Sequence, residues 1–129
     1  MPTQRPTTIR NRTQLFEEVC ELVELEYAED LQLDGIASRI ASSRRQLQRA
    51  FAEIGRTTFR AHLTRVRMEK AAELLSDGRL TVREVAHRVG YRQPAQFAKA
   101  FRRAHGAAPS EYRASLGFRS DKSQLATAA

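Results

Sequence analysis

The sequence contains very little cysteine and no long apolar run, and each of these absences excludes a class of protein. Its one cysteine, Cys20, excludes an internal disulfide and a zinc site with several cysteine ligands, so we expect it to pack in the core. A membrane-spanning helix would need about 18 consecutive apolar residues, and no such run is present. The first residues include arginine but no apolar segment, so they do not predict a secretory signal. These absences predict a cytoplasmic protein with no membrane partner.

Motifs for catalysis and for cofactors are also missing. The sequence has no glycine-rich phosphate loop, no nucleophile motif and no paired carboxylates. The histidines His62, His87 and His105 lie far apart and have no companion ligands at metal-binding spacing. We therefore predict no enzymatic activity, no metal site and no cofactor.

Basic charge is abundant, and it is unevenly distributed along the chain. The formal net charge is +7, yet residues 13–30 contain seven acidic residues and no basic one, whereas residues 31–129 contain 19 basic and 8 acidic residues. The resulting net charge of +11 on the second stretch predicts a polyanionic partner. Two interpretations of the acidic stretch stay open. It is either a solvated outer face or a docking face for RNA polymerase or another regulator, which would use Glu17, Glu21 and Glu24.

Apolar residues recur with helical spacing along the chain, and glycine and proline fall between the periodic stretches, which predicts an all-α fold. Capping boxes are expected at Ser43 with Gln46 and at Thr81 with Glu84. We expect Ile54 to be buried with the apolar face of the helix that Ser43 begins. The expected helices span about residues 13–29, 33–40, 43–54, 58–76, 81–89 and 94–105, with a final turn at about 110–116.

One six-residue phrase occurs twice, as QLQRAF at 46–51 and as QFAKAF at 96–101. In both places it follows a short helix and a tight turn, and its own helix has a basic, amide-rich exposed face. This is the pattern of a helix-turn-helix present twice, a unit whose second helix enters the major groove of DNA. A single basic helix face is usually just a solvated surface, but two matching units favour DNA binding.

Exposed positions early in each second helix are the expected base readers, because arginine can read guanine and glutamine can read adenine. In the first unit these are Ser43, Arg44, Arg45, Gln48 and Arg49, and in the second unit they are Gln93, Ala95, Gln96 and Lys99. Phosphate contacts are expected from Thr81, Arg102 and Arg103. The second unit has fewer charged donors, so we expect it to depend more on apolar contact and on DNA shape.

A long helix at about 58–76 is expected to connect the two units. Its 19 residues correspond to about 28 Å at 1.5 Å per residue, and successive major grooves on one face of DNA lie about 34 Å apart. A rigid helix of this length could hold two reading heads one turn of DNA apart.

These residues also resemble a known family. The segments SSRRQLQRAF, FRAHLTRVRMEKAAELL and VREVAHRVGYRQPAQFAKAFRRAHGAAPSEYR are similar to the DNA-binding domain of the AraC/XylS transcription regulators. The resemblance runs from about Leu15 to Arg113 and implies seven helices, in which one long helix joins two helix-turn-helix units. It implies as recognition positions Ser43, Arg45, Gln48, Arg49, Ala95, Gln96 and Lys99. The family usually has glycine where this chain has Arg56, and here Gly55 comes one place earlier.

The expected organisation is a flexible basic arm (1–12), an acidic helix with the first helix-turn-helix (13–56), the linker helix (57–78), the second helix-turn-helix (79–116) and a disordered tail (117–129). We predict a nucleoid-associated regulator that binds specific double-stranded DNA. The resemblance to the small stand-alone members of the family implies an activator that binds DNA as a monomer. The alternative is an architectural or partner-dependent DNA-binding module that acts through its acidic helix.

Overall fold

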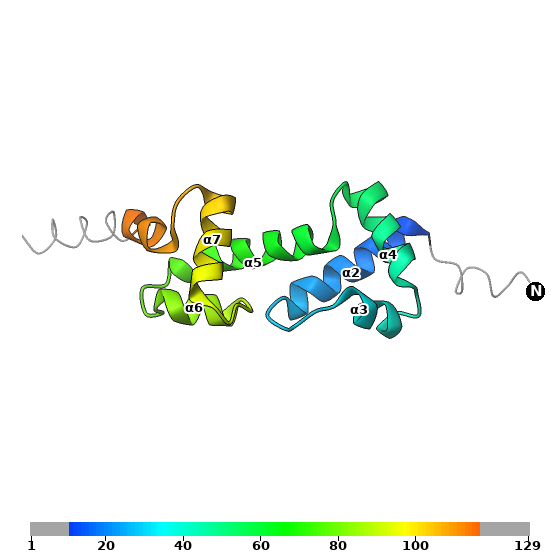
Figure 1. Ribbon diagram of the computed structural model, residues 1–129, viewed down its shortest axis with the longest axis horizontal. Helices are drawn as coiled ribbons and strands as arrows, with labels where there is room; N and C mark the ends of the chain where they lie inside the picture. The colour runs from blue at the N-terminus through cyan, green and yellow to red at the C-terminus, as the bar shows by residue number, and fades with distance from the viewer. Residues whose placement is uncertain (1–10, 117–129) are drawn as a thin grey trace, which may run out of the picture. The chain divides into compact units, whose positions relative to one another are not determined.

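The computed structural model describes residues 11–116, which contain helices and no strand (Figure 1), and this confirms the all-α prediction. If the π-helical turn η2 is counted as the end of α4, seven helices are described in this range. They are α2 (Arg12–Glu26), α3 (Leu33–Arg39), α4 (Arg44–Ala50) with η2 (Phe51–Gly55), α5 (Phe59–Leu75), α6 (Val82–Arg88), α7 (Pro94–His105) and a last helix at 109–116. None of the described helices is long and apolar enough to cross a membrane.

The chain forms two compact units, and the division between them falls inside α5, between Leu63 and Thr64. The first unit contains α2, α3, α4 and η2, and the second contains α6, α7 and the helix at 109–116. The predicted arm and tail lie outside the described residues, except that Asn11 and Arg12 cap and begin α2.

α2 begins with a complete capping box and ends one turn earlier than expected. The Asn11 carboxamide accepts a hydrogen bond from the Gln14 N–H at 2.8 Å, and the Gln14 carboxamide accepts from the Asn11 N–H at 3.1 Å. After Glu26 the chain turns, because the Glu29 N–H donates to the Glu26 carbonyl at 2.9 Å in a three-residue step. The expectation that this helix reaches Glu29 was therefore wrong.

An aromatic cluster around Phe51 forms the centre of the first unit, where α2 packs on α4 and η2 while α3 packs on α4. The Phe51 ring is fully buried, and its centroid lies 5.0 Å from that of Phe16 and 5.9 Å from that of Phe59, both in T-shaped arrangements. The His62 ring completes the cluster at 5.5 Å. Such edge-to-face pairs are the geometry that aromatic rings prefer. Apolar residues at helical spacing on α2, α3 and α4 are also buried, and they include Leu15, Val19, Val23, Ile36 and Leu47.

The chain widens into the π-helical turn η2 directly after α4. Here the backbone N–H groups of Arg56 and Thr57 both donate to the carbonyl of Phe51. A π-helical turn holds more residues than an α-helical turn, so it rotates the following side chains around the helix axis. Ile54 is 41% exposed as a result, and the expectation that it is buried was wrong.

Gly55 lies directly against the ring of Phe16. A Cβ atom on Gly55 would lie 2.5 Å from Cε1 of Phe16, well inside van der Waals contact. The next residue, Arg56, adopts the left-handed conformation with φ at 55°, which costs a non-glycine residue about 1–2 kcal/mol. The glycine thus comes one place before the left-handed position, at the point where the Phe16 ring approaches the backbone.

α5 begins at a threonine and is slightly shorter than the expected 58–76. Thr58 Oγ1 accepts from the Ala61 N–H at 3.0 Å, which satisfies one of the free donors in the first turn. The helix contains 17 residues and is therefore about 25 Å long.

Residues of α5, α6 and α7 form the core of the second unit, and α6 packs directly on α7. Thr81 caps α6 in a complete capping box with Glu84, as predicted. α7 ends at Gly106, whose φ of 80° is the left-handed conformation that closes many helices. The buried side chains are those of Met68, Ala71, Leu75, Val85, Val89, Phe97 and Phe101.

Two side chains fasten the C-terminal part of the second unit to α5. Arg113 donates from Nε to the Leu75 carbonyl and from Nη2 to the Asp77 carbonyl, both at 3.2 Å, where α5 ends. His105 Nε2 lies 3.1 Å from the Met68 carbonyl. Arg113 thereby satisfies the Leu75 carbonyl, which lies in the last turn of α5 and has no partner within the helix.

Candidate nucleic-acid interface

α4 is the second helix of the first helix-turn-helix, and Ser43 caps it by accepting from the Gln46 N–H at 3.1 Å. The other half of the predicted capping box is not formed, because the Gln46 side-chain oxygen accepts from the Ser42 hydroxyl at 2.8 Å instead. Leu47 and Ala50 are fully buried, as predicted. These two residues fix which side of α4 faces solvent.

Three exposed side chains lie on α4 away from this buried face, and we call Arg45, Gln48 and Arg49 the α4 reading group. Arg45 and Arg49 are four residues apart, so they lie one above the other on the same side of the helix. Within residues 11–116 neither arginine has an ion-pair partner. Their guanidinium groups are therefore available for a guanine edge or a phosphate.

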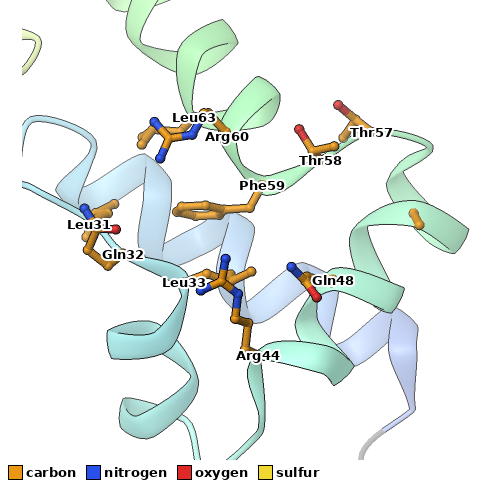
Figure 2. Close-up of a pocket in the computed structure, with 11 residues that line it drawn as sticks. Leu31, Gln32, Leu33, Arg44, Gln48, Thr57, Thr58, Phe59, Arg60 and Leu63 are labelled. Carbon is orange, nitrogen blue, oxygen red and sulfur yellow. The ribbon is translucent and has the colours of Figure 1, made fainter.

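Arg44 and Ser43 are placed differently from the reading group. Arg44 Nη1 donates to Asp34 Oδ2 of α3 at 3.1 Å, so this arginine is directed toward the first helix of its own unit. Together with Gln48 it also lines a pocket beside α4 (Figure 2). Ser43 is exposed, but its hydroxyl oxygen is engaged as the cap of α4.

α7 is the corresponding helix of the second unit, and its surface has fewer donors. Pro94 occupies the first helical position, as predicted. At an offset of fifty positions, Ala95 replaces Arg45 and Lys99 replaces Arg49. The exposed residues on and next to α7 include all of the expected ones: Gln93, Ala95, Gln96, Lys99, Arg102 and Arg103.

Thr81, an expected phosphate contact, is exposed at the start of α6. Its hydroxyl oxygen accepts from the Glu84 N–H at 3.0 Å, and its own N–H donates to Glu84 Oε1 at 2.8 Å. The hydrogen bond from the Thr81 N–H is the main cause that lowers the pKa of Glu84 below its usual range. The threonine hydroxyl keeps its own proton as a donor for a phosphate.

A shallow basic depression of about 670 Å³ runs along α6 and the turn after it, and sequence reasoning had missed it. Its basic lining residues are Arg83, His87, Arg88 and Arg92. The signal was present as three arginines and one histidine within ten positions, with Glu84 as the one acid among them. In a helix-turn-helix the first helix crosses the DNA backbone, so these residues belong to the candidate interface.

The acidic stretch does not form one uniform surface. Arg39 of α3 donates to both carboxylate oxygens of Glu26, at 2.8 and 2.7 Å, and this hydrogen bonding lowers the pKa of Glu26. Glu26 therefore holds α2 against α3. The exposed acids on α2 include Glu17, Glu21 and Glu24. Leu25, next to Glu24, has 83% of its surface exposed.

Cys20 and the histidines take no part in a metal site among the described residues. Residues 11–116 contain no group of three or more His, Cys, Asp or Glu side chains arranged to hold a metal ion. Cys20 is half-buried on α2 rather than enclosed in the core, which corrects the expectation for it. His62 is buried and packs on Phe51.

Comparison with known proteins agrees with this geometry. The family model of a helix-turn-helix domain matches residues 36–115. The HTH-type transcriptional regulator YpdC of Escherichia coli is 33% identical over 100 residues, which cover 78% of this chain and 35% of YpdC. The HTH-type transcriptional regulator Rv1395 of Mycobacterium tuberculosis is 43% identical over 77 residues, which cover 60% of this chain and 22% of that protein. The chain thus spans about a third or less of the length of these curated relatives.

Solved structures show the same fold. The C-terminal domain of AraT, a response regulator from Geobacillus stearothermophilus, is 35% identical with a TM-score of 0.74, over 78% of this chain and 84% of that one. A probable AraC family transcriptional regulator from Rhodopseudomonas palustris is 27% identical with a TM-score of 0.73, over 80% and 97%. The DNA-binding domain of the transcriptional factor AdpA, in complex with a target DNA, is 29% identical with a TM-score of 0.70, over 84% and 94%. The chain therefore belongs to the AraC/XylS family of transcription regulators, and it corresponds to the DNA-binding domain of that family.

Proposed function

We propose that this domain binds specific double-stranded DNA and that α4 is its principal reading helix. The observation that carries the proposal is the α4 reading group, in which two arginines without ion-pair partners in residues 11–116 flank a glutamine on one exposed face. Arginine can donate two parallel hydrogen bonds to guanine, and glutamine can pair with adenine. The likeness to the AdpA domain, which was solved with its target DNA, supports DNA as the partner.

α7 supports α4 with fewer base contacts in this proposal. Ala95 and Lys99 replace the two arginines of the reading group, so the second unit reads DNA through apolar contact and shape more than through hydrogen bonds. Gln93 and Gln96 add amide donors at the start of the helix. Phosphate contacts come from Thr81, Arg102 and Arg103, and also from the basic depression along α6.

The two helix-turn-helix units act together on adjacent major grooves, and the domain binds as a monomer. Support comes from the repeated unit itself and from α5, which continues without a break for 17 residues from one unit into the other. A protein of this kind would act at the nucleoid. We propose activation as the regulatory outcome, with Glu17, Glu21 and Glu24 as a surface for RNA polymerase.

A second candidate function is a partner-dependent DNA-binding module. The observation that favours it is the acidic exposed face of α2, which includes Glu17, Glu21 and Glu24. Negative charge repels a polyanion, so this face suits a protein partner better than a nucleic acid. Replacement of Glu17, Glu21 and Glu24 by glutamine should leave DNA affinity within a few-fold and lower promoter activation. Unchanged activation would remove the polymerase surface from the proposal.

The principal experiment selects the preferred DNA site in vitro and compares its affinity with that of random duplex. A ratio of about 10³ or more is expected for a sequence-specific regulator. Arg45→Ala should lower this ratio, whereas Arg65→Ala, which removes an exposed arginine paired with Glu69 on α5, should leave it unchanged. A ratio near one would favour the architectural module.

A one-residue insertion tests the cooperation of the two units. An alanine inserted between Leu63 and Thr64 divides α5 where the two compact units divide, so each unit keeps its own buried residues in register. The extra residue rotates one unit relative to the other by about 100°. The footprint on DNA should shorten to one half of the site, and affinity should fall toward that of a single unit. A folded insertion variant with a full footprint would show that the units do not need a fixed orientation.

A further inference from the structure

A pocket in the first unit has no role in the function proposed above. It has a volume of about 320 Å³ and lies between α4 and the beginning of α5 (Figure 2). This is the lower end of the range for small-molecule sites, which are about 300–1,000 Å³ and combine an apolar lining with a few polar groups. Leu33, Phe59 and Leu63 contribute to the apolar lining, and Arg44, Gln48 and Arg60 contribute to the polar lining.

Phe59 provides a flat apolar surface within the pocket. Its ring is held in a T-shaped contact with the buried ring of Phe51, with centroids 5.9 Å apart and an interplanar angle of 81°. Figure 2 shows Phe59 in the middle of the pocket, with Arg44 and Arg60 on opposite sides of the ring in this view. A planar apolar group would therefore find one aromatic surface and two cationic side chains together.

The electrostatics of the pocket favour an anion. No acidic residue lines it. Arg60 has no ion-pair partner in the described part of the chain, and Arg44 uses Nη1 for an ion pair with Asp34 whose side chains are both more than half exposed. The pocket also receives the first residues of α5, whose amide groups carry the positive end of the helix dipole.

We propose that this pocket binds a small aromatic carboxylate and that occupancy weakens DNA binding. The ring of the ligand packs on Phe59 and on the leucines, and the carboxylate pairs with Arg60 and with the donors of Arg44 that Asp34 leaves available. Arginine is suited to this role because its planar group matches a carboxylate with two parallel hydrogen bonds. The apolar lining distinguishes such a ligand from a bare anion.

The regulatory part of this inference rests on the proposed function, because it requires α4 to be the reading helix. Arg44 and Gln48 belong both to α4 and to the pocket. A bound carboxylate engages these side chains and places a negative charge next to the surface that meets a polyanion. By linkage, the factor by which the ligand weakens DNA binding equals the factor by which DNA weakens ligand binding.

The first test measures ligand binding without DNA. Hydrocinnamate, hydrocinnamyl alcohol and inorganic phosphate are titrated into the protein, and the amide signals of Gln48, Thr58 and Leu63 are followed by NMR. Hydrocinnamate should cause saturable shifts, and the alcohol and phosphate should bind at least about tenfold more weakly, a difference of about 1.4 kcal/mol. Phosphate that binds as tightly as hydrocinnamate would overturn the aromatic class and leave a general anion site. The absence of saturable shifts would overturn the site altogether.

Two arginine variants distinguish binding in the pocket from a general effect of positive charge on hydrocinnamate affinity. Arg60→Gln should weaken hydrocinnamate binding about tenfold or more, whereas Arg56→Gln removes an exposed charge of the same unit outside the pocket and should not weaken it. Equal losses in both variants would overturn the site. Arg60 is exposed, so its replacement leaves the buried residues of the unit in place.

The second test measures DNA affinity with and without hydrocinnamate. Saturating ligand should weaken binding to the selected site about fivefold or more, and Arg60→Gln should remove most of this effect. Ligand that binds without any change in DNA affinity would overturn the regulatory part. A ligand-free protein that shows no preference for a selected site would contradict the proposed function, while the ligand titration would still decide the pocket.

Discussion

The two helix-turn-helix units share an interior and differ at the surface. Phe51 and Phe101 are fully buried at equivalent positions of the repeat, and so are Leu47 and Phe97. The outward positions, in contrast, change from two arginines in α4 to alanine and Lys99 in α7. The comparison shows that the repeat preserves packing, whereas the chemistry offered to DNA is specific to each unit.

The helix ends also differ between the units, and here the second unit has the stronger local signals. The second unit has a complete capping box at Thr81 and a glycine at the left-handed position after α7, Gly106. At the equivalent places the first unit has Gln32, whose side chain makes no cap, and Arg56, which adopts the left-handed conformation without being glycine. The unit with the richer reading surface therefore has the weaker local signals at these two places.

The largest loss of stability is expected at Phe51, in the centre of the aromatic cluster of the first unit. Phe51→Ala should destabilise the first unit by about 3–5 kcal/mol, because it leaves a cavity among rings that cannot close it. Chemical denaturation followed by circular dichroism measures this change. Ile54→Ala, three residues away and 41% exposed, is the matched control and should cost well under half as much. Similar losses for both variants would contradict the assignment of the π-helical turn.

The two reading helices should lose different amounts of DNA affinity when one cationic side chain is removed from each. Arg49→Ala should weaken binding to the selected site by about 1–3 kcal/mol and relax preference at one base pair. Lys99→Ala, at the equivalent position of α7, should cost less, because lysine is a point charge that lacks the two parallel hydrogen bonds of arginine. Fluorescence anisotropy with the selected site and with random DNA measures the two variants. An Arg49→Ala loss that is equal on both DNAs would make Arg49 a phosphate contact.

The contact between Gly55 and the Phe16 ring, at the end of the first reading helix, is tested by a methyl group at position 55. Gly55→Ala should destabilise the first unit by about 1–3 kcal/mol, because the new methyl group forces the Phe16 ring away from Phe51. Gly35→Ala on α3 has open space around the new atom and should stabilise the helix by about 1 kcal/mol. Thermal unfolding measures both variants. Phe16→Leu in the Gly55→Ala background should recover part of the loss.

The smallest effect concerns the caps of the two first helices. Thr81→Ala should cost about 1 kcal/mol, whereas Gln32→Thr should be neutral or slightly stabilising, since it adds a cap that α3 lacks. The Thr81 difference should depend on pH. Glu84 has a lowered pKa in the folded domain, so its contribution is present above the ordinary glutamate pKa of about 4.3 and is lost as the pH falls through the lower folded value.

Unfolding of wild type and Thr81→Ala at neutral and at acidic pH checks this prediction. The stability difference between the two proteins should shrink on the acidic side. A difference that stays constant over the whole range would show that Glu84 takes no part in the cap.

Periodicity and capping motifs were sufficient to predict the helices and the buried faces of α4 and α7, because these depend on local spacing. The burial of Ile54 was predicted wrongly because a π-helical turn has no simple sequence signal. The partners of Arg44 and Gln46 could not be predicted either. Each of these side chains had several equally plausible hydrogen-bond partners in the sequence. Only the tertiary arrangement of α3 and of the turn before α4 selects Asp34 for Arg44 and Ser42 for Gln46.

The contact between Gly55 and the Phe16 ring links two positions that are 39 residues apart in the sequence. A change at one of them alters what is tolerated at the other, so the two positions should evolve as a pair. Homologous chains that carry a larger residue in place of Gly55 should carry a smaller one in place of Phe16, and those that keep the ring should keep the glycine. Among homologous domains, Phe16 in the first helix and Gly55 at the end of α4 should therefore be conserved together, although no helix-turn-helix motif connects the two positions.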